Sequence, residues 1–243
     1  MILRCIYESA DCCRRLARYE EALKFLSTFP GVPALKAASL DTPATLDLYC
    51  RAYYLKGDIL SILKNFPDAE KAYRECRIQA GNTLLGYSAQ GRMGEMLMEI
   101  AALQVNPKAA QNIYVNADKF FREIISADTS AIPVRHTLRI IAKSRLAISL
   151  CRQGKTEEAL QRYEDLYTDL KQGDNLYTAL NGVYFQNTVL DMATLLEQKG
   201  DMASLEKLMK YYQALANANL GVSDTARERL RKLQEKISGK DGK

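Results

Sequence analysis

The chain has 243 residues, 47% hydrophobic and 26% charged, which is the composition of an ordinary globular protein long enough to bury a full core. It has no run of about 18 apolar residues, which excludes a membrane-spanning helix, and its short apolar start lacks a secretion-signal cleavage site. The net charge of +5 comes from basic residues interleaved with acids, so we expect no nucleic-acid binding.

The cysteine and histidine content argues against a metal site. Six cysteines occur without a Cys-x-x-Cys pair, and the chain has one histidine. Adjacent Cys12 and Cys13 would point about 100° apart on a helix. We therefore expect no metal and no cofactor. Free thiols suit a reducing compartment and a cytoplasmic location, the alternative being an exported fragment of a longer protein.

In chain order, apolar periodicity and turn residues predict a series of helices. The predicted helices lie at residues 3–16, 19–29, 43–64, 67–80, 83–104, 107–126, 134–153, 156–171, 176–198, 202–217 and 223–238, with a connector over 31–41. Thr42 before Pro43 is a favoured helix start, because threonine caps the free amide groups and proline suits the first helical position. The first helix has no such cap. We expect the chain to begin within a longer array or a longer protein.

A repeated spacing of small and aromatic residues links these helices in pairs. Ala147, Ala159, Tyr163 and Leu166 are separated by twelve, four and three residues. The small side chains would let two helices cross closely, and the tyrosine would fill the space beside them. The same steps recur in Gly57, Ala69, Tyr73 and Cys76, in Ala10, Ala22, Leu26 and Phe29, and more weakly in Ala193, Leu205, Met209 and Tyr212.

The segments LKGDILSILKNFPDAEKAYREC and LAISLCRQGKTEEALQRYEDL resemble the tetratricopeptide repeat (TPR) family. This resemblance implies an all-α, right-handed superhelical array of antiparallel helix hairpins, a TPR-like α-solenoid of about 11 helices. Residues 1–222 would form about five hairpins. Residues 223–238 would form a C-terminal capping helix, and residues 239–243 a disordered tail.

One hairpin, at residues 83–126, is longer than the others. Gly94, Ala117, Phe121 and Ile124 follow the repeat only if eleven residues are inserted between the two helices. We expect the insertion to divide between both helices, about one and a half turns each, which would make a projecting hairpin.

Two features that could suggest catalysis have simpler interpretations. Gly154-Lys155-Thr156 resembles the end of a phosphate-binding loop, but Ser149 stands where that loop requires glycine, so a turn between paired helices is favoured. His136 has no serine or cysteine placed beside it by the sequence, which favours a surface or packing role. We expect a protein that is not an enzyme.

In proteins similar to TPR arrays, the first helix of each pair lines a groove for a partner's peptide or helix. The corresponding residues here are Arg4, Tyr7, Asp11, Arg14, Arg51, Tyr54, Asp58, Ser61, Glu95, Met98, Arg145 and Arg152. Arginine and tyrosine often dominate binding energy at interfaces. The family's best known variant clamps a C-terminal carboxylate with lysine and asparagine, but Tyr7 and Asp11 stand at the matching positions, so that clamp is absent.

The sequence therefore predicts a scaffold that binds another protein through this concave face. Replacing Arg51 by glutamate and Tyr54 by alanine would then abolish binding without affecting stability. Three alternatives remain open. The polar faces could be merely solvated, the projecting hairpin and the first helix could mediate self-association, or a polar cavity could support an all-α enzyme.

Overall fold

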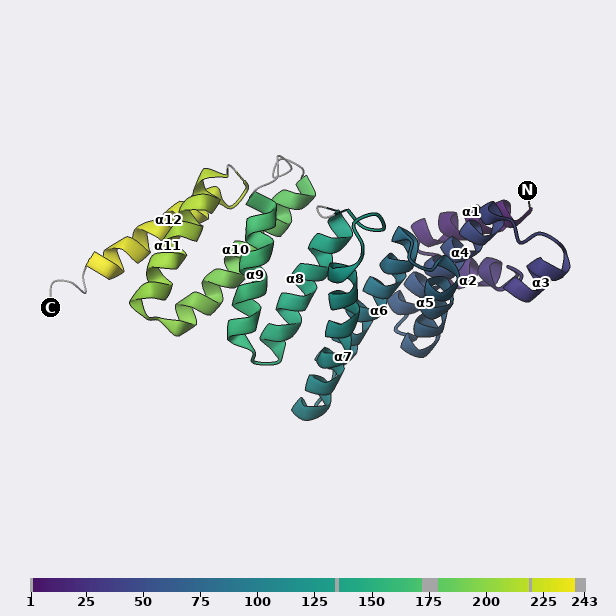
Figure 1. Ribbon diagram of the computed structural model, residues 1–243, viewed down its shortest axis with the longest axis horizontal. Helices are drawn as coiled ribbons and strands as arrows, with labels where there is room; N and C mark the ends of the chain where they lie inside the picture. Colours follow the sequence, from purple (N-terminus) through teal and green to yellow (C-terminus); the bar gives the residue numbers. More distant parts are fainter. Residues whose placement is uncertain (1, 134–135, 172–178, 219, 239–243) are drawn as a thin grey trace. The chain divides into compact units, whose positions relative to one another are not determined.

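The computed structural model in Figure 1 describes residues 2–133, 136–171, 179–218 and 220–238, without the side chains of 179–181 and 236. These described residues form twelve helices and no strand. The helices are α1 (Ile2–Arg15), α2 (Tyr19–Ser27), α3 (Val32–Ala37), α4 (Pro43–Ile62), α5 (Phe66–Ala80), α6 (Leu84–Ala102), α7 (Pro107–Ser126), α8 (Thr137–Arg152), α9 (Thr156–Lys171), α10 (Ala179–Lys199), α11 (Met202–Asn217) and α12 (Ser223–Ser238).

The chain divides into two compact units, which we describe separately. Unit 1 extends to Val134 and contains α1 to α7, and unit 2 begins at Arg135 and contains α8 to α12. In each unit, helices that follow one another in the chain pack as antiparallel pairs, such as α4 with α5 and α8 with α9 (Figure 1).

The repeated small and aromatic residues form the centre of each hairpin. A Cβ atom added to Gly57 would lie 2.6 Å from the Tyr73 ring, and one added to Gly94 would lie 2.8 Å from the Phe121 ring. Both rings are almost completely buried. Glycine is therefore required at these two crossings because the ring on the second helix occupies the space of a side chain.

Most predicted helix starts are confirmed. Thr42 caps α4, its hydroxyl accepting a hydrogen bond from the Thr45 amide, and the Asn106 side chain caps α7. The predicted start of the helix at 134 is wrong, because α8 begins at Thr137. His136 is its N-cap, and the Nδ1 atom accepts the Leu138 amide proton at 3.1 Å.

The predicted connector over residues 31–41 contains the helix α3. Gly31 precedes it, and Val32 and Leu35 turn inward, with Leu35 only 1% exposed. Two apolar residues three positions apart lie on the same side of a helical turn and can be buried together. The sequence interpretation gave weight to the proline and small residues and missed this short apolar pair.

We expect Leu35→Ala to lower the free energy of unfolding by about 2–4 kcal/mol, because it leaves a cavity between α3 and the core. Chemical denaturation would measure this loss. Lys36→Ala, at an exposed neighbouring position, is the control and should change the stability by less than about 0.5 kcal/mol. An equal effect of both substitutions would show that α3 does not pack as described.

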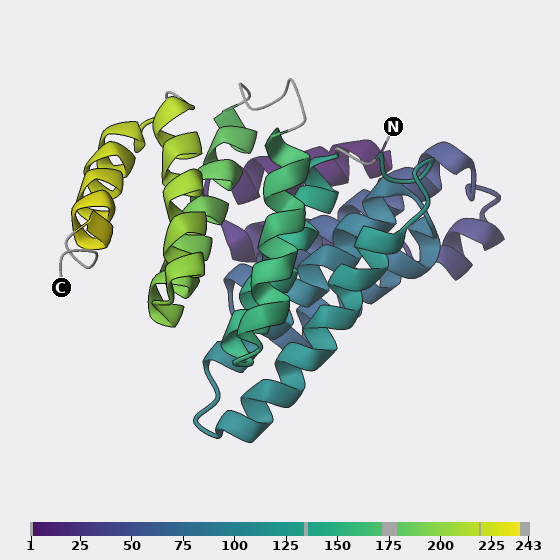
Figure 2. The same ribbon diagram turned by 60° about the vertical axis from the view of Figure 1, so that its left-hand side comes forward.

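The longer hairpin consists of α6 and α7. Helix α6 continues eight residues past Gly94, where α4 continues five past Gly57, and α7 begins ten residues before Ala117, where α5 begins three before Ala69. The insertion therefore lengthens α7 much more than α6, and not both equally as expected. The turn between α6 and α7 extends past the turn between α4 and α5 (Figures 1 and 2).

Helix α12 packs against α11, with Leu233 buried and an ion pair between Glu228 and Lys232 at 2.6 Å. The proposed disordered tail, residues 239–243, lies outside the described residues. Within the described ranges, no cluster of three metal-ligating side chains occurs, and no helix is long and apolar enough to cross a membrane.

Candidate functional site

Ten of the twelve predicted binding residues lie in unit 1, on the first helices of its three hairpins. These helices are α1, α4 and α6, and α4 contacts both of the others. We call their shared surface the first-helix face, formed by Arg4, Tyr7, Asp11, Arg14, Arg51, Tyr54, Asp58, Ser61, Glu95 and Met98. The other two predicted residues, Arg145 and Arg152, lie on α8 in unit 2.

A row of carboxylates runs along the first-helix face. Asp11, Asp58 and Glu95 each directly follow the small residue of their hairpin, so they occupy one repeat position on three neighbouring helices. Their side chains are only 19%, 24% and 23% exposed, respectively. Carboxylates that lie so deep need cationic or hydrogen-bonding partners.

Two arginines hold Asp11. Arg14 donates from Nη2 to Asp11 Oδ1 at 2.8 Å, and Arg15 donates from Nε to Oδ2 at 2.8 Å. Partial burial acts to raise the pKa of Asp11, but these two hydrogen bonds lower it below its ordinary value. Asp11 is therefore a charged, fixed anchor for the guanidinium groups.

Asp58 is the centre of a second cluster. It accepts a hydrogen bond from the Tyr73 hydroxyl at 2.7 Å, and its Oδ1 atom lies 3.3 Å from Arg92 Nε. Burial raises the pKa of Asp58, while Arg92 and Tyr73 act in the opposite direction. The cluster connects the repeat's central tyrosine to the first-helix face.

Arg92 joins this cluster to α6, and the sequence analysis missed it. Its guanidinium donates to Tyr54 Oη at 3.1 Å and to Glu95 Oε2 at 2.9 Å. Burial acts to lower the pKa of Arg92, but Asp58, Tyr54 and Glu95 raise it, so the side chain stays cationic. Arg92 could have been predicted from the sequence, because it lies two residues before the small residue of its hairpin, as the predicted Arg145 does in α8.

Arg14 and Arg92 lie further out than the carboxylates that hold them. Arg14 is 35% exposed and Arg92 47%, whereas Arg51 and its partner Asp47 are both 55% exposed. Beside them, a cleft of about 730 Å³ opens between α1 and α4, with Arg4, Tyr7 and Arg51 among its lining residues. A molecule that approaches Arg14 or Arg92 meets the guanidinium group first, and the paired acids lie beneath it.

Tyr54 has a different role from the predicted one. Its ring packs edge-on against the Tyr73 ring, with a centroid distance of 5.9 Å, and its hydroxyl accepts from Arg92. Tyr54→Ala would therefore disturb the packing of unit 1 as well as any binding. We therefore expect the Arg51→Glu, Tyr54→Ala variant to lose stability as well as any binding, and exposed arginines are better test positions.

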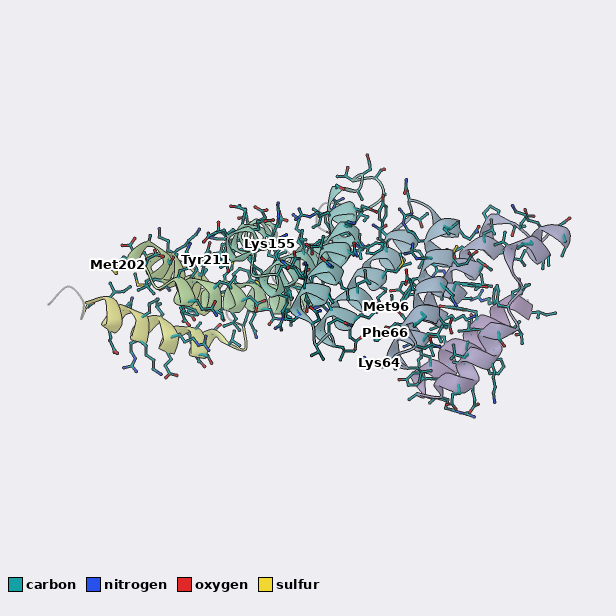
Figure 3. All side chains as sticks on the ribbon, turned by 90° about the horizontal axis from the view of Figure 1, so that it is seen from below. Lys64, Phe66, Met96, Lys155, Met202 and Tyr211 are labelled. Atoms are coloured by element: carbon teal, nitrogen blue, oxygen red, sulfur yellow. The ribbon has the colours of Figure 1, made fainter. Side chains whose placement is uncertain are left out.

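Other conspicuous residues of unit 1 have structural roles. Lys64, in the turn between α4 and α5, lies 5.8 Å above the centre of the Phe66 ring and pairs with Glu99 of α6. Lys64 and Phe66 are labelled in Figure 3. These contacts tie the turn to the next hairpin.

In unit 2, the Gly154-Lys155-Thr156 segment is a turn between α8 and α9, with Gly154 at a φ of +74°. Helices flank it on both sides, as in a helical hairpin and unlike a phosphate-binding loop. His136 caps α8 as described above. Both features therefore have the structural roles that the sequence favoured.

These repeated helix crossings define a TPR-like α-solenoid fold. Two solved structures have the same fold. One is a variant of the nearly identical TPR-like repeats assigned to a kinesin light chain of Podosopora anserina, with a TM-score of 0.55 and 17% identity over 97% of this chain and 96% of that one. The other is BtubC (BKLC) from P. vanneervenii, with a TM-score of 0.50 and 14% identity over 98% of this chain and 93% of that one. No protein-family model and no curated protein matches the chain.

Proposed function

We propose that the protein is a non-catalytic scaffold that binds an acidic peptide or helix of another protein on the first-helix face of unit 1. The observation that carries this proposal is the layering of charge. Arg14 and Arg92, 35% and 47% exposed, lie above carboxylates that are about one-fifth to one-quarter exposed. Interfaces favour complementary charge, so the outer guanidinium layer suits a partner with aspartate or glutamate side chains.

Pre-organisation of the arginines supports the proposal. Arg14 and Arg92 are each held by ion pairs to half-buried acids of the same face. A planar guanidinium that is already fixed loses little side-chain freedom when it binds a carboxylate, and it can bind with two parallel hydrogen bonds. The TPR-like fold of the chain is consistent with a scaffold role, whereas the identity of the partner depends on the residues of the face.

A peptide selection tests the proposal directly. Immobilised wild-type chain would be used to select from a library of random 15-residue peptides, and we expect the selected sequences to be enriched in aspartate and glutamate. Their affinity should fall by about tenfold or more when Arg4 and Arg51 are both replaced by glutamate. Selected peptides that are neutral or basic, or that bind this variant equally well, would contradict the proposal.

A matched variant controls for charge alone. Arg4 and Arg51 each pair with an acid one turn away on the same helix. Arg74 and Arg231 form the same kind of pair, with Glu70 and Glu235, on α5 and α12. The Arg74→Glu, Arg231→Glu variant has the same change in net charge, and we expect it to bind the selected peptides as the wild type does.

A further inference from the structure

A second cleft in unit 1 is lined by side chains from α2, α3, α4 and α5. Its volume is about 890 Å³, and Tyr49, Tyr53, Lys56, Asp68 and Glu75 are among its lining residues. We call it the second-helix cleft, because it lies between the second helices of two successive hairpins. It shares no residue with the first-helix face. Binding in this cleft therefore uses none of the side chains proposed above to bind an acidic partner.

Glu75 is a carboxylate of this cleft that has no cationic partner. Its Oε1 atom accepts a hydrogen bond from the Tyr49 hydroxyl at 2.9 Å and another from Gln79 Nε2 at 3.2 Å. Among the described residues, no donor reaches Oε2, and no lysine or arginine forms an ion pair with Glu75. The side chain is half-buried, and a carboxylate partly removed from water attracts a cation more strongly than a fully exposed one.

The two lysines of the cleft lie near the start of α5, around Asp68. Lys71 pairs with Asp68 at 2.9 Å. Hydrogen bonds from Lys71 and Asn65 lower the pKa of Asp68, and the nearby charge of Lys56 adds to this effect. Glu75 lies seven residues further along the helix, about 10 Å away at about 1.5 Å per residue. The cleft therefore has a cationic end and an acidic end, and the acidic end lacks a counter-charge.

The next hairpin shows what occupies the equivalent place. Glu123 has the repeat position of Glu75, because each lies six residues after the alanine at the crossing of its second helix. Gln90 Nε2 donates to Glu123 Oε2 at 2.6 Å, and Arg77 Nε donates to Gln90 Oε1 at 2.8 Å. The Arg77 guanidinium also lies 4.8 Å from the centre of the Tyr87 ring. An arginine of the preceding second helix is thus linked to the carboxylate and packs on an aromatic ring.

The second-helix cleft lacks this arginine. Pro30, just after α2, has the repeat position of Arg77, and proline carries no charge. Tyr53 has the repeat position of Gln90, and its ring centre lies 4.5 Å from that of the Tyr49 ring. The cleft therefore combines a carboxylate and aromatic rings with an open space, whereas a guanidinium fills the place at the next hairpin.

We propose that an arginine side chain of another protein binds at the acidic end of the second-helix cleft. Its guanidinium donates to Oε2 of Glu75 and lies beside the ring of Tyr53. Arginine suits this place better than lysine, because its planar group donates in a fixed fork and packs on aromatic rings. The segment bound here is therefore basic at this point, opposite in charge to the partner proposed for the first-helix face.

A subtractive peptide selection tests this site. A library of random 15-residue peptides would be depleted on the Glu75→Gln variant and then selected on the wild-type chain. Glutamine keeps an acceptor for the Tyr49 hydroxyl and removes only the charge. We expect the selected peptides to be enriched in arginine and to bind the Glu75→Gln variant about tenfold or more weakly. Peptides without arginine enrichment, or no peptide that survives depletion, would overturn the proposal.

Glu70→Gln is the matched control for the loss of charge. Glu70 is also on α5 but lies outside the cleft, where it pairs with Arg74. The selected peptides should bind this variant as they bind the wild type. Equal weakening by both substitutions would show that binding follows net charge and not the cleft.

A change in the peptide makes the test independent of the folding of any variant. Replacing the selected arginine by citrulline, which has nearly the same shape and no charge, should lower the affinity for the wild type by about tenfold or more. The same replacement should have little effect on the residual binding to the Glu75→Gln variant, because the two groups form one contact. Equal wild-type affinities of the arginine and citrulline peptides, or an equal loss with both proteins, would contradict a contact between this arginine and Glu75.

Discussion

Replacing Tyr73 by alanine should lower the free energy of unfolding by about 3–5 kcal/mol. The ring is 1% exposed, it fills the space above Gly57, and its hydroxyl donates to Asp58. Chemical denaturation followed by circular dichroism would measure the loss. A loss below about 1 kcal/mol would show that the ring does not fill the crossing of α4 and α5.

A double-mutant cycle isolates the contact between Gly57 and the ring. In the wild type, Gly57→Ala should cost about 1–2 kcal/mol, because its Cβ would lie 2.6 Å from the ring. In the Tyr73→Ala background the same substitution should be neutral or stabilise by up to about 1 kcal/mol, since alanine favours the helix. Gly221→Ala, where the added Cβ would meet nothing within 4 Å, is the control for the chemical change alone.

Replacing Arg92 by methionine should cost about 2 kcal/mol at neutral pH, because it leaves Asp58 without its cationic partner. A fully buried pair would lose roughly 3–5 kcal/mol, and the partial exposure of Arg92 reduces the effect. Adding Asp58→Asn should restore most of the lost stability, since a neutral amide can still accept the Tyr73 proton. A double variant as unstable as the Arg92→Met variant would contradict this account of the cluster.

The Arg92→Met loss should also depend on pH. Burial raises the pKa of Asp58 above its unfolded value, so protonation of Asp58 favours the folded state. The contribution of Asp58 to the free energy of unfolding is most favourable at low pH, and it is lost as the pH rises through the pKa of Asp58 in the folded protein. Without Arg92 this pKa rises further. The Arg92→Met variant should therefore approach the stability of the wild type as the pH falls below the pKa of Asp58 in the variant. A constant deficit across this range would show that Asp58 is not the group left unpaired.

The sequence predicted the features of the fold that depend on local spacing. The steps from Ala147 to Leu166 and their copies identified the helix crossings, because a small residue opposite a large ring is required wherever two helices pack closely. Capping residues such as Thr42 located helix starts, since their side chains bond the free amides directly. The helix α3 was missed because a single buried pair, Val32 and Leu35, is too short to show a period.

The candidate site was predictable in outline and not in detail. Repeat position placed Asp11, Asp58 and Glu95 on one face, because residues at one position of a repeat lie side by side in the array. The position of Arg92 also follows from the repeat, but the acids with which it pairs depend on side-chain reach between helices, which the repeat spacing does not give. The packing role of Tyr54 could not be predicted either. Its partner Tyr73 lies on α5, and the spacing of residues along α4 carries no information about that contact.

The most direct test of the proposed function is an affinity isolation from native lysate followed by mass spectrometry. The wild type, the Arg4→Glu, Arg51→Glu variant and the Arg74→Glu, Arg231→Glu control would be compared at equal concentration. We expect a protein with an acidic segment to be recovered with the wild type and with the control, and to be lost with the first-helix-face variant. Equal recovery with all three proteins would contradict binding at the first-helix face of unit 1.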